Sequence, residues 1–198
     1  TWILTVRGCY HGRTYGGISL ARGSFMAHGT LEGLGPVPGD VIQLTPPWPY
    51  HTELYGGEDL VGFCARELET TIERLGAGRI AAMFGEPVMG PAGMIPPPDE
   101  YWPRMTAVLK AHDIPLVFDE VVTAFGRVGS WYGSVHYGVE PDIIICAKGM
   151  ASGYMPISAI LVSAEVADTL EGTYAGGSYG GHPTSCAVAK ANIDIIER

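Results

Sequence analysis

The alternation of short apolar segments with helical patterns is the feature that most constrains the fold of this chain. Between two such segments, apolar residues recur at spacings of three and four from Val61 to Leu75, which indicates an amphipathic helix. The acidic residues Glu58 and Asp59 precede this pattern and Gly76 follows it, as expected at the two ends of a helix. Further helices are predicted near Tyr101–Ala111, Ser163–Leu170 and Thr184–Glu197.

The segments predicted to be strands are Trp2–Val6, Val41–Leu44, Ile80–Phe84, Pro115–Phe118, Pro141–Ala147 and Ile157–Val162. Strands that alternate with helices are typical of an α/β fold on a parallel sheet, and the nearly continuous hydrophobicity predicts strands buried on both faces.

Two proline-rich stretches lie between these elements. The first, from Gly33 to Gly57, is longer than an ordinary connection, and we expect an ordered loop that serves as a lid or an interface. The second runs from Pro87 to Pro98. The sequence has no internal repeat and no low-complexity linker, so residues 1–198 are predicted to be one unit without an internal domain boundary.

The charge of the chain limits the partners that it can bind. The formal net charge is −9 at pH 7, which argues against nucleic acid because phosphate binding needs a basic surface. Only 17% of the residues are charged, against about 25% in an average soluble domain, so either much of the surface is covered or the core is large. No apolar run approaches the roughly 18 residues of a membrane-spanning helix. We therefore expect a protein that contacts neither nucleic acid nor a membrane.

The four cysteines, Cys9, Cys64, Cys146 and Cys186, are far apart and form no C-x-x-C pair. This spacing disfavours a disulfide framework or a zinc site, and we expect free thiols in a reducing cytoplasm.

The chain begins within a predicted strand and ends within a predicted helix, so we expect it to be part of a longer protein.

Polar side chains follow four of the predicted strands, where ligands of parallel α/β sheets bind. The segment after the first strand contains Tyr10-His11-Gly12, and Gly85-Glu86-Pro87 follows the third. Asp119-Glu120 follows the next strand, and Lys148-Gly149 follows the strand after that. An aromatic residue with a histidine, two carboxylates and a lysine are therefore expected at one edge of the sheet.

Lys148 differs from the other two lysines of the chain, Lys110 and Lys190, which fall in helical stretches among polar neighbours. It ends an apolar strand and precedes a glycine, where partial desolvation favours a neutral, nucleophilic amine. The alternative is a lysine that extends to solvent or pairs with a carboxylate. Position alone leaves both interpretations open.

The other candidates also have structural interpretations. Asp119 is either a functional carboxylate or a residue that orders the following loop, and Glu86 is equally able to anchor a loop. Tyr10-His11-Gly12 alone is compatible with the start of a helix. Asp119-Glu120 resembles the end of a magnesium-binding Walker B strand, but the chain lacks the G-x-x-x-x-G-K-[ST] loop that such a site needs. The absence of H-E-x-x-H and of G-x-G-x-x-G disfavours zinc peptidase and dinucleotide-binding functions.

An amine, a carboxylate and a stacking aromatic ring together suit pyridoxal phosphate. Its aldehyde bonds to a lysine, its pyridine nitrogen needs an anionic partner to stay protonated, and its flat ring packs between side chains. These residue types therefore point to pyridoxal-phosphate chemistry, with no metal site predicted.

Five blocks, in this order, resemble the class III aminotransferases, which are pyridoxal-phosphate enzymes of fold type I. The blocks are Tyr10-His11-Gly12, Gly85-Glu86-Pro87-Val88, Phe118-Asp119-Glu120-Val121-Val122-Thr123-Ala124-Phe125-Gly126-Arg127, Ala147-Lys148-Gly149-Met150-Ala151-Ser152-Gly153-Tyr154-Met155-Pro156 and Gly181-His182-Pro183. The resemblance covers essentially the whole chain. It implies a three-layer α/β large domain with a mainly parallel sheet, of which residues 1–198 are the central portion, truncated at both ends.

The resemblance implies roles for individual residues. Lys148 would be the Schiff-base lysine and Asp119 the partner of the pyridine nitrogen, so these two are the expected catalytic residues. Tyr10 would stack on one face of the ring, and Val121 would pack on the other. Glu86 resembles the family glutamate that pairs with a substrate-binding arginine from a later region. The residues expected to bind the cofactor are Tyr10, His11, Gly12, Glu86, Asp119, Val121, Lys148 and Ser178.

Three positions qualify this assignment. Ser178 stands where the family usually has a threonine that binds the cofactor phosphate across the dimer interface, and it keeps the hydroxyl. Ala124 stands where glycine is common. Arg127 is either a carboxylate binder or part of a structural ion pair. The resemblance also places the family's Gly-Ser phosphate-binding segment before Thr1 and its small C-terminal domain after Arg198.

The expected activity is transfer of an amino group from an ω-amino acid or amine to pyruvate or another 2-oxo acid, by a cytoplasmic homodimer with a shared active site. Three alternatives stay open at this point. An aminomutase of the glutamate-1-semialdehyde type would need no separate acceptor. An aldolase-like lyase would use Lys148 without the cofactor, and a truncated chain could be an inactive interaction piece.

Overall fold

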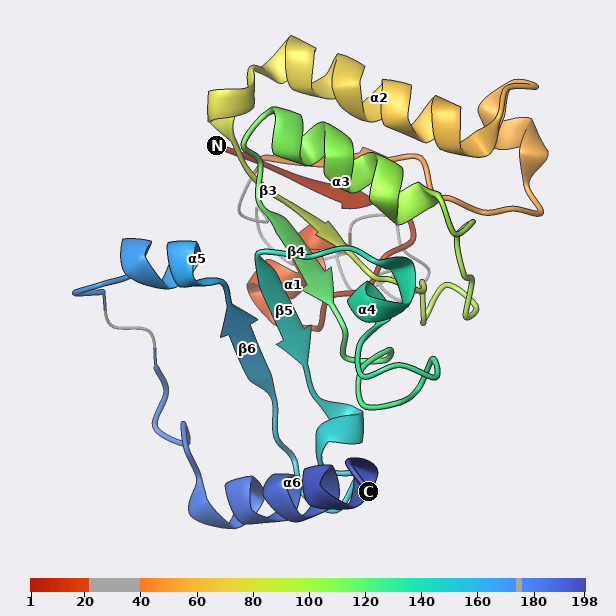
Figure 1. Cartoon of the computed structure of the whole chain (residues 1–198). Coiled ribbons are helices and arrows are strands. Elements are labelled where there is room, and N and C mark those ends of the chain that lie inside the picture. Colours follow the sequence, from red (N-terminus) through yellow and green to blue (C-terminus); the bar gives the residue numbers. More distant parts are fainter. Residues whose placement is uncertain (22–39, 174–175) are drawn as a thin grey trace.

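A computed structural model describes residues 1–21, 40–173 and 176–198, and its centre is a six-stranded sheet (Figure 1). The strands are β1 (Trp2–Val6), β2 (Asp40–Leu44), β3 (Ile80–Gly85), β4 (Leu116–Asp119), β5 (Ile143–Cys146) and β6 (Ala159–Val162). Their order across the sheet is β2-β1-β3-β4-β5-β6. The first five strands are parallel, and β6 runs antiparallel to β5. The predicted α/β fold with a mainly parallel sheet is confirmed.

Six helices accompany the sheet in the described residues. They are α1 (Tyr15–Leu20), α2 (Leu60–Leu75), α3 (Tyr101–Ala111), α4 (Gly133–Tyr137), α5 (Ala164–Thr169) and α6 (Pro183–Ile196). Short 3₁₀ turns are η2 (Thr52–Tyr55), η3 (Ala77–Arg79) and η4 (Lys148–Met150). The four predicted helices are confirmed as α2, α3, α5 and α6. The short α1 and α4 were not predicted.

The ends of α2 follow directly from the sequence. The Asp59 carboxylate accepts a hydrogen bond of 2.7 Å from the Gly62 N–H, which is the usual way to cap a helix N-terminus. Gly76 ends the helix with a φ of 82°, a backbone conformation that favours glycine. Leu68 and Ile72 are almost completely buried, and they belong to the core cluster that α2 and α3 form with the sheet. These two helices therefore cover one face of the sheet (Figure 1).

The opposite face carries α1. Side chains alternate along a strand, so Thr5 points away from Leu4 and Val6, which belong to the core under α2 and α3. The Thr5 Oγ1 lies 3.0 Å from the Cys9 Sγ, and the Cys9 thiol contacts the Leu20 carbonyl at the end of α1 at 3.5 Å. The helices thus lie on both faces of the sheet, in the predicted three-layer arrangement.

Gly85 brings a helix close to the end of β3. A Cβ at this position would lie 2.1 Å from a ring atom of Trp102 in α3, so only glycine fits. The Trp102 indole N–H also donates a 3.1 Å hydrogen bond to the Pro87 carbonyl. The packing of α3 therefore fixes the chain on both sides of Glu86.

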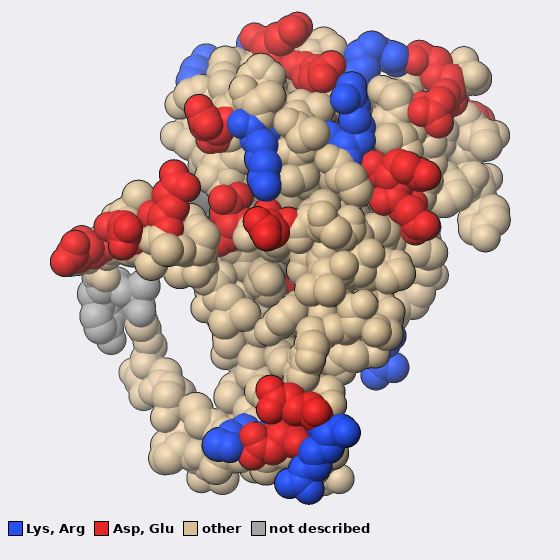
Figure 2. Space-filling model, viewed as in Figure 1, with Lys and Arg blue, Asp and Glu red and all other residues tan. Residues whose placement is uncertain are grey.

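The expectation that every strand is buried on both faces is wrong for the last strand. Ile160, Leu161 and Val162 of β6 are 67%, 43% and 39% exposed, because no described segment covers them. Figure 2 shows uncharged surface between the charged side chains over α2 and α3 and those on α6. The exposed residues of β6 are thus both apolar and uncovered.

The remaining expectations concern loops, thiols and membranes. Residues 33–39 lie outside the described ones, and the rest of the first proline-rich stretch contains β2 and the turn η2, so it is only partly a loop. The second stretch is a loop with a bridge between Met89 and Ile95. All four cysteines are free, as expected. Among the described helices, none combines the length and apolar character needed to cross a bilayer.

Candidate active site

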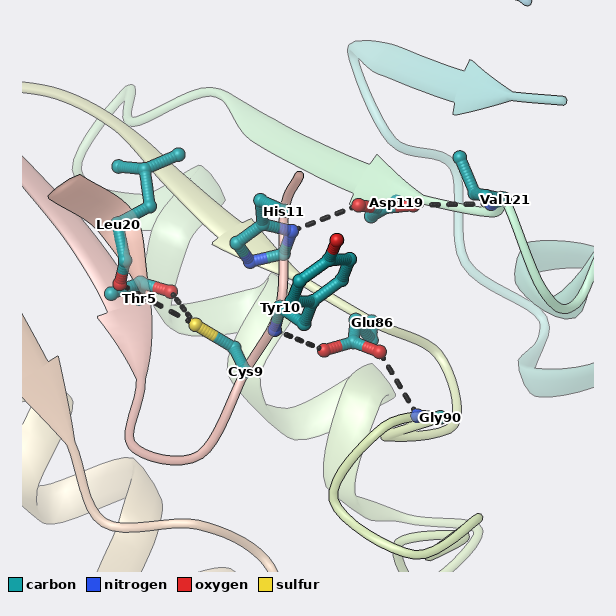
Figure 3. A network of polar contacts seen from close by, with 9 residues as sticks. All are labelled: Thr5, Cys9, Tyr10, His11, Leu20, Glu86, Gly90, Asp119 and Val121. Carbon is teal, nitrogen blue, oxygen red and sulfur yellow. Dashed lines mark hydrogen bonds and ion pairs between the residues drawn. The ribbon is translucent and has the colours of Figure 1, made fainter. Parts of the chain in front are cut away.

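A buried pair, His11 and Asp119, lies where β1 and β4 end (Figure 3). The His11 Nδ1 is 2.9 Å from one carboxylate oxygen of Asp119, and the side chains are only 2% and 11% exposed. The Val121 N–H donates a 3.1 Å hydrogen bond to the other oxygen. These contacts fix the direction of the carboxylate, and each oxygen keeps a lone pair for another donor.

The charge on His11 follows from its surroundings. Burial on its own would lower the pKa of this histidine, but the hydrogen bond to Asp119 and the neighbouring Cys9 thiol raise it to about 10. At neutral pH the pair is therefore an imidazolium beside a carboxylate. The sequence placed both residues at this edge, but it contained no signal for the contact between them.

Glu86 organises the same region through the backbone. One oxygen accepts a 2.8 Å hydrogen bond from the Tyr10 N–H, and the other accepts a 2.9 Å bond from the Gly90 N–H (Figure 3). Burial raises the pKa of the Glu86 carboxyl, and these two bonds partly offset the rise. Glu86 thus holds the backbone of Tyr10, directly before His11. Its expected pairing with an arginine stays a prediction.

Lys148 reaches the same edge from β5. The register pairs Asp119 of β4 with Ile145 of β5, and Lys148 follows three residues later in η4. Its φ is 34°, in the left-handed region that side-chain-bearing residues seldom adopt. Lys148 is exposed in the described residues, which agrees with the interpretation of a lysine that extends to solvent. The turn carries the side chain beyond the buried end of the strand.

Ser178 shares a groove with Lys148. The groove has a volume of about 1360 Å³, and Lys148, Pro156, Ser178 and His182 are among the residues that line it. Ser178 is exposed and lies in a turn that precedes α6. Gly176-Gly177-Ser178-Tyr179-Gly180 also fits the G-x-S-x-G pattern. A nucleophile elbow directly follows a strand, whereas the described element before this turn is the helix α5.

The structure places the other predicted residues as follows. Gly12 has a φ of 98°, which explains glycine after His11. Val121 is half-buried and belongs to the Asp119 contacts described above. Arg127 is exposed and Ala124 is buried. The described contacts therefore join Tyr10, His11, Glu86, Asp119 and Val121, while Lys148 and Ser178 meet along the groove.

Glu120 is a structural residue that the sequence reasoning missed. It is completely buried, and its carboxylate accepts hydrogen bonds from the Thr123 hydroxyl and from the N–H groups of Gly133 and Ser134, the last two at 2.7 Å. It therefore ties the loop after Asp119 to the start of α4. The only feature of the sequence that drew attention to Glu120 was its position inside the block Asp119-Glu120-Val121.

The arrangement fits a protonated aromatic nitrogen. The Asp119 carboxylate is nearly buried and oriented by His11 and the Val121 N–H, so it suits a charge-assisted hydrogen bond to such a nitrogen. Tyr10 supplies a flat ring beside it (Figure 3), and Lys148 supplies an amine at the same edge of the sheet. A carboxylate, a flat ring and an amine at one edge are the groups that pyridoxal phosphate needs, so these residues fit that cofactor.

The raised pKa of His11 predicts how stability changes with pH. Its stabilising contribution is fully present below the unfolded pKa of about 6.5 and is lost as the pH rises through about 10. In the cofactor-free full-length protein, we expect the free energy of unfolding to fall between these values by on the order of a few kcal/mol more than in His11→Asn. Denaturant titrations at several pH values measure this. Parallel curves for the two proteins would contradict the charged state of His11.

Comparisons with known proteins identify the family of the chain. The family model for class-III aminotransferases matches residues 1–198. The chain is 38% identical to the putrescine–pyruvate aminotransferase of Pseudomonas aeruginosa over 190 residues, which covers 94% of the chain and 41% of that protein. The chain thus spans less than half the length of this relative.

Two solved structures have the same fold. An (S)-enantioselective omega-transaminase from Thermomicrobium roseum superposes with a TM-score of 0.90 at 44% identity, over 98% of this chain and 44% of that one. An amine transaminase from an uncultivated Pseudomonas species, in a PLP-bound form, gives 0.90 at 40% identity, over 100% of this chain and 46% of that one. With the match over its whole length, the chain belongs to the class-III aminotransferase family.

Proposed function

We propose that the full-length protein is a pyridoxal-phosphate-dependent transaminase that moves an amino group from an ω-amino acid or amine to pyruvate or another 2-oxo acid. The observation that carries this proposal is the Asp119 carboxylate, held by His11 at 2.9 Å and by the Val121 N–H at 3.1 Å on the sheet edge that Lys148 also reaches. The family membership and the printed activities of the relatives support it.

Each residue contributes one property to the reaction. Bound pyridoxal phosphate supplies an electron sink for the electrons released at the substrate carbon. Asp119 would keep a proton on the ring nitrogen, and His11 holds the Asp119 carboxylate in place for that contact. Lys148 would supply the amine that attaches the cofactor. Once free, this amine would take a proton from the substrate carbon as a base and deliver it, as an acid, to the cofactor carbon that had carried the aldehyde. Tyr10 and Val121 confine the ring from its two faces.

The remaining parts of the proposal concern the assembly. Ser178 binds the cofactor phosphate of a second subunit, so that the enzyme is a homodimer with a shared active site. Its exposure in the turn before α6 supports this role. Residues 1–198 form the central part of the cofactor-binding domain, and Glu86 pairs with an arginine from another part of the protein. The free thiols support a cytoplasmic location.

Product analysis of the full-length protein tests the proposal. With pyridoxal phosphate, an ω-amino acid or a diamine, and pyruvate, we expect alanine to form in proportion to the loss of donor amine. Omitting the 2-oxo acid stops the reaction after one half-turnover per active site. Continued isomerisation of the donor without an acceptor would instead show an aminomutase, and no amine transfer with any donor would overturn the proposal.

A further inference from the structure

A side chain from far along the sequence holds the turn that carries Lys148. The Asn192 Nδ2 of α6 donates hydrogen bonds to the carbonyl oxygens of Gly149 at 2.8 Å and Met150 at 3.1 Å. The Asn192 Oδ1 accepts a 2.7 Å bond from the Ser152 hydroxyl. Both ends of the amide group therefore serve one short segment.

This segment has an unusual backbone. Lys148 and Ser152 have φ angles of 34° and 48°, both in the left-handed region, although neither is glycine. Such conformations persist only where the surroundings fix them, and they cluster at functional sites. The bonds within the turn, from the Met150 N–H to Ala147 and from the Ala151 N–H to Lys148, close it locally. The Asn192 bonds attach it to a separate helix.

The same helix is continuous with the opposite wall of the groove. Lys148 lines one side, and the segment that contains Ser178 and His182 lines another and leads directly into α6. Ala189 of α6 belongs to the same buried cluster as Met150 and Ala151, and Figure 1 shows α6 beside the turn that follows β5. Asn192 therefore links the helix that follows one wall to the turn that carries Lys148 on the other.

We propose that Asn192 is a positioning residue for Lys148, which holds the lysine backbone in its left-handed conformation and so directs the amine toward the cofactor aldehyde. This inference rests on the proposed function, in which Lys148 attaches the cofactor. A residue that only docks α6 would affect stability and leave the behaviour of the amine unchanged.

Three variants of the full-length protein separate these roles. Asn192→Asp has nearly the same shape and keeps the bond from Ser152, but its oxygens cannot donate to the two carbonyl groups. Ser152→Ala removes only the third bond. Asp194→Ala is the matched control, because Asp194 lies on the same helix and pairs with exposed Lys190.

The measurement is the rate at which cofactor-free protein takes up pyridoxal phosphate at Lys148, followed by absorbance, together with the pH dependence of that absorbance. We expect uptake to slow by roughly tenfold to a hundredfold in Asn192→Asp, because small misplacements of reacting groups cost this much. Ser152→Ala should show a smaller effect, and Asp194→Ala none. The pH midpoint of the absorbance should shift in Asn192→Asp and stay unchanged in Asp194→Ala.

The outcomes distinguish this inference from the proposed function. A lower melting temperature in Asn192→Asp with wild-type uptake and pH midpoint would overturn the positioning role alone. Wild-type protein that attaches no cofactor at Lys148 would overturn both. If Asn192→Asp does not fold, Ser152→Ala decides, since uptake at the rate of Asp194→Ala would contradict the proposal.

Discussion

Replacing Lys148 by alanine in the full-length protein is expected to abolish attachment of pyridoxal phosphate and nearly all transamination. Two contributions are lost together, the amine that bonds the cofactor and the general base for the proton transfer. The second alone is typically worth roughly 10²–10⁴-fold in rate. Turnover and the absorbance of the protein-bound cofactor measure the two losses separately.

The other two lysines of the chain are matched controls. Lys110 is exposed in the last turn of α3, and Lys190 is 76% exposed on α6, where it pairs with Asp194. We expect Lys110→Ala and Lys190→Ala to keep both cofactor attachment and turnover close to wild type. Activity in Lys148→Ala, or its loss in either control, would contradict the role assigned to Lys148.

The second large effect is expected for Asp119→Asn. The amide keeps the shape of the carboxylate and can still accept the bond from the Val121 N–H, but it removes the charge that keeps the ring nitrogen protonated. A charge-assisted hydrogen bond is worth roughly 1.5–3 kcal/mol, so we expect kcat to fall about tenfold to a hundredfold or more. Attachment of the cofactor to Lys148 should survive. Steady-state kinetics and the absorbance spectrum check both statements.

Asp142→Asn provides the control for this substitution. The Asp142 carboxylate accepts a 2.8 Å hydrogen bond from the Leu116 N–H at the other end of β4, so its role is structural. We expect this variant to lose stability while kcat stays near the wild-type value. Equal losses of kcat in Asp119→Asn and Asp142→Asn would show that Asp119 acts only through the fold.

The elements predicted well from the sequence are those with strong local signals. Trp2–Val6 and Tyr101–Ala111 have the predicted bounds, because their hydrophobic patterns do not depend on distant residues. The helix α4 has five residues, and its first N–H groups bond to Glu120, more than ten positions earlier. The direction of β6 was also not predictable, because an apolar run looks the same in a parallel and an antiparallel strand.

In the candidate site too, local sequence signals were predictive and contacts between distant residues were not. Reading the residue after each strand brought Tyr10, Glu86, Asp119 and Lys148 to one edge, since the ends of parallel strands meet there. The ion pair of His11 with Asp119 spans 108 positions, and no spacing rule connects residues so far apart. The sequence left open whether Lys148 is desolvated or extends to solvent, because the turn η4, which carries it out of the sheet, has no local sequence signal.

Chemical mapping of the cofactor on the full-length protein tests the central claim most directly. Borohydride reduction of the protein loaded with pyridoxal phosphate makes the attachment permanent, and mass spectrometry of its peptides then identifies the modified residue. We expect the label on Lys148 alone among the three lysines of this chain. A label on Lys110 or Lys190, or an unlabelled Lys148 in fully loaded protein, would contradict the assignment of the sheet edge as the cofactor site.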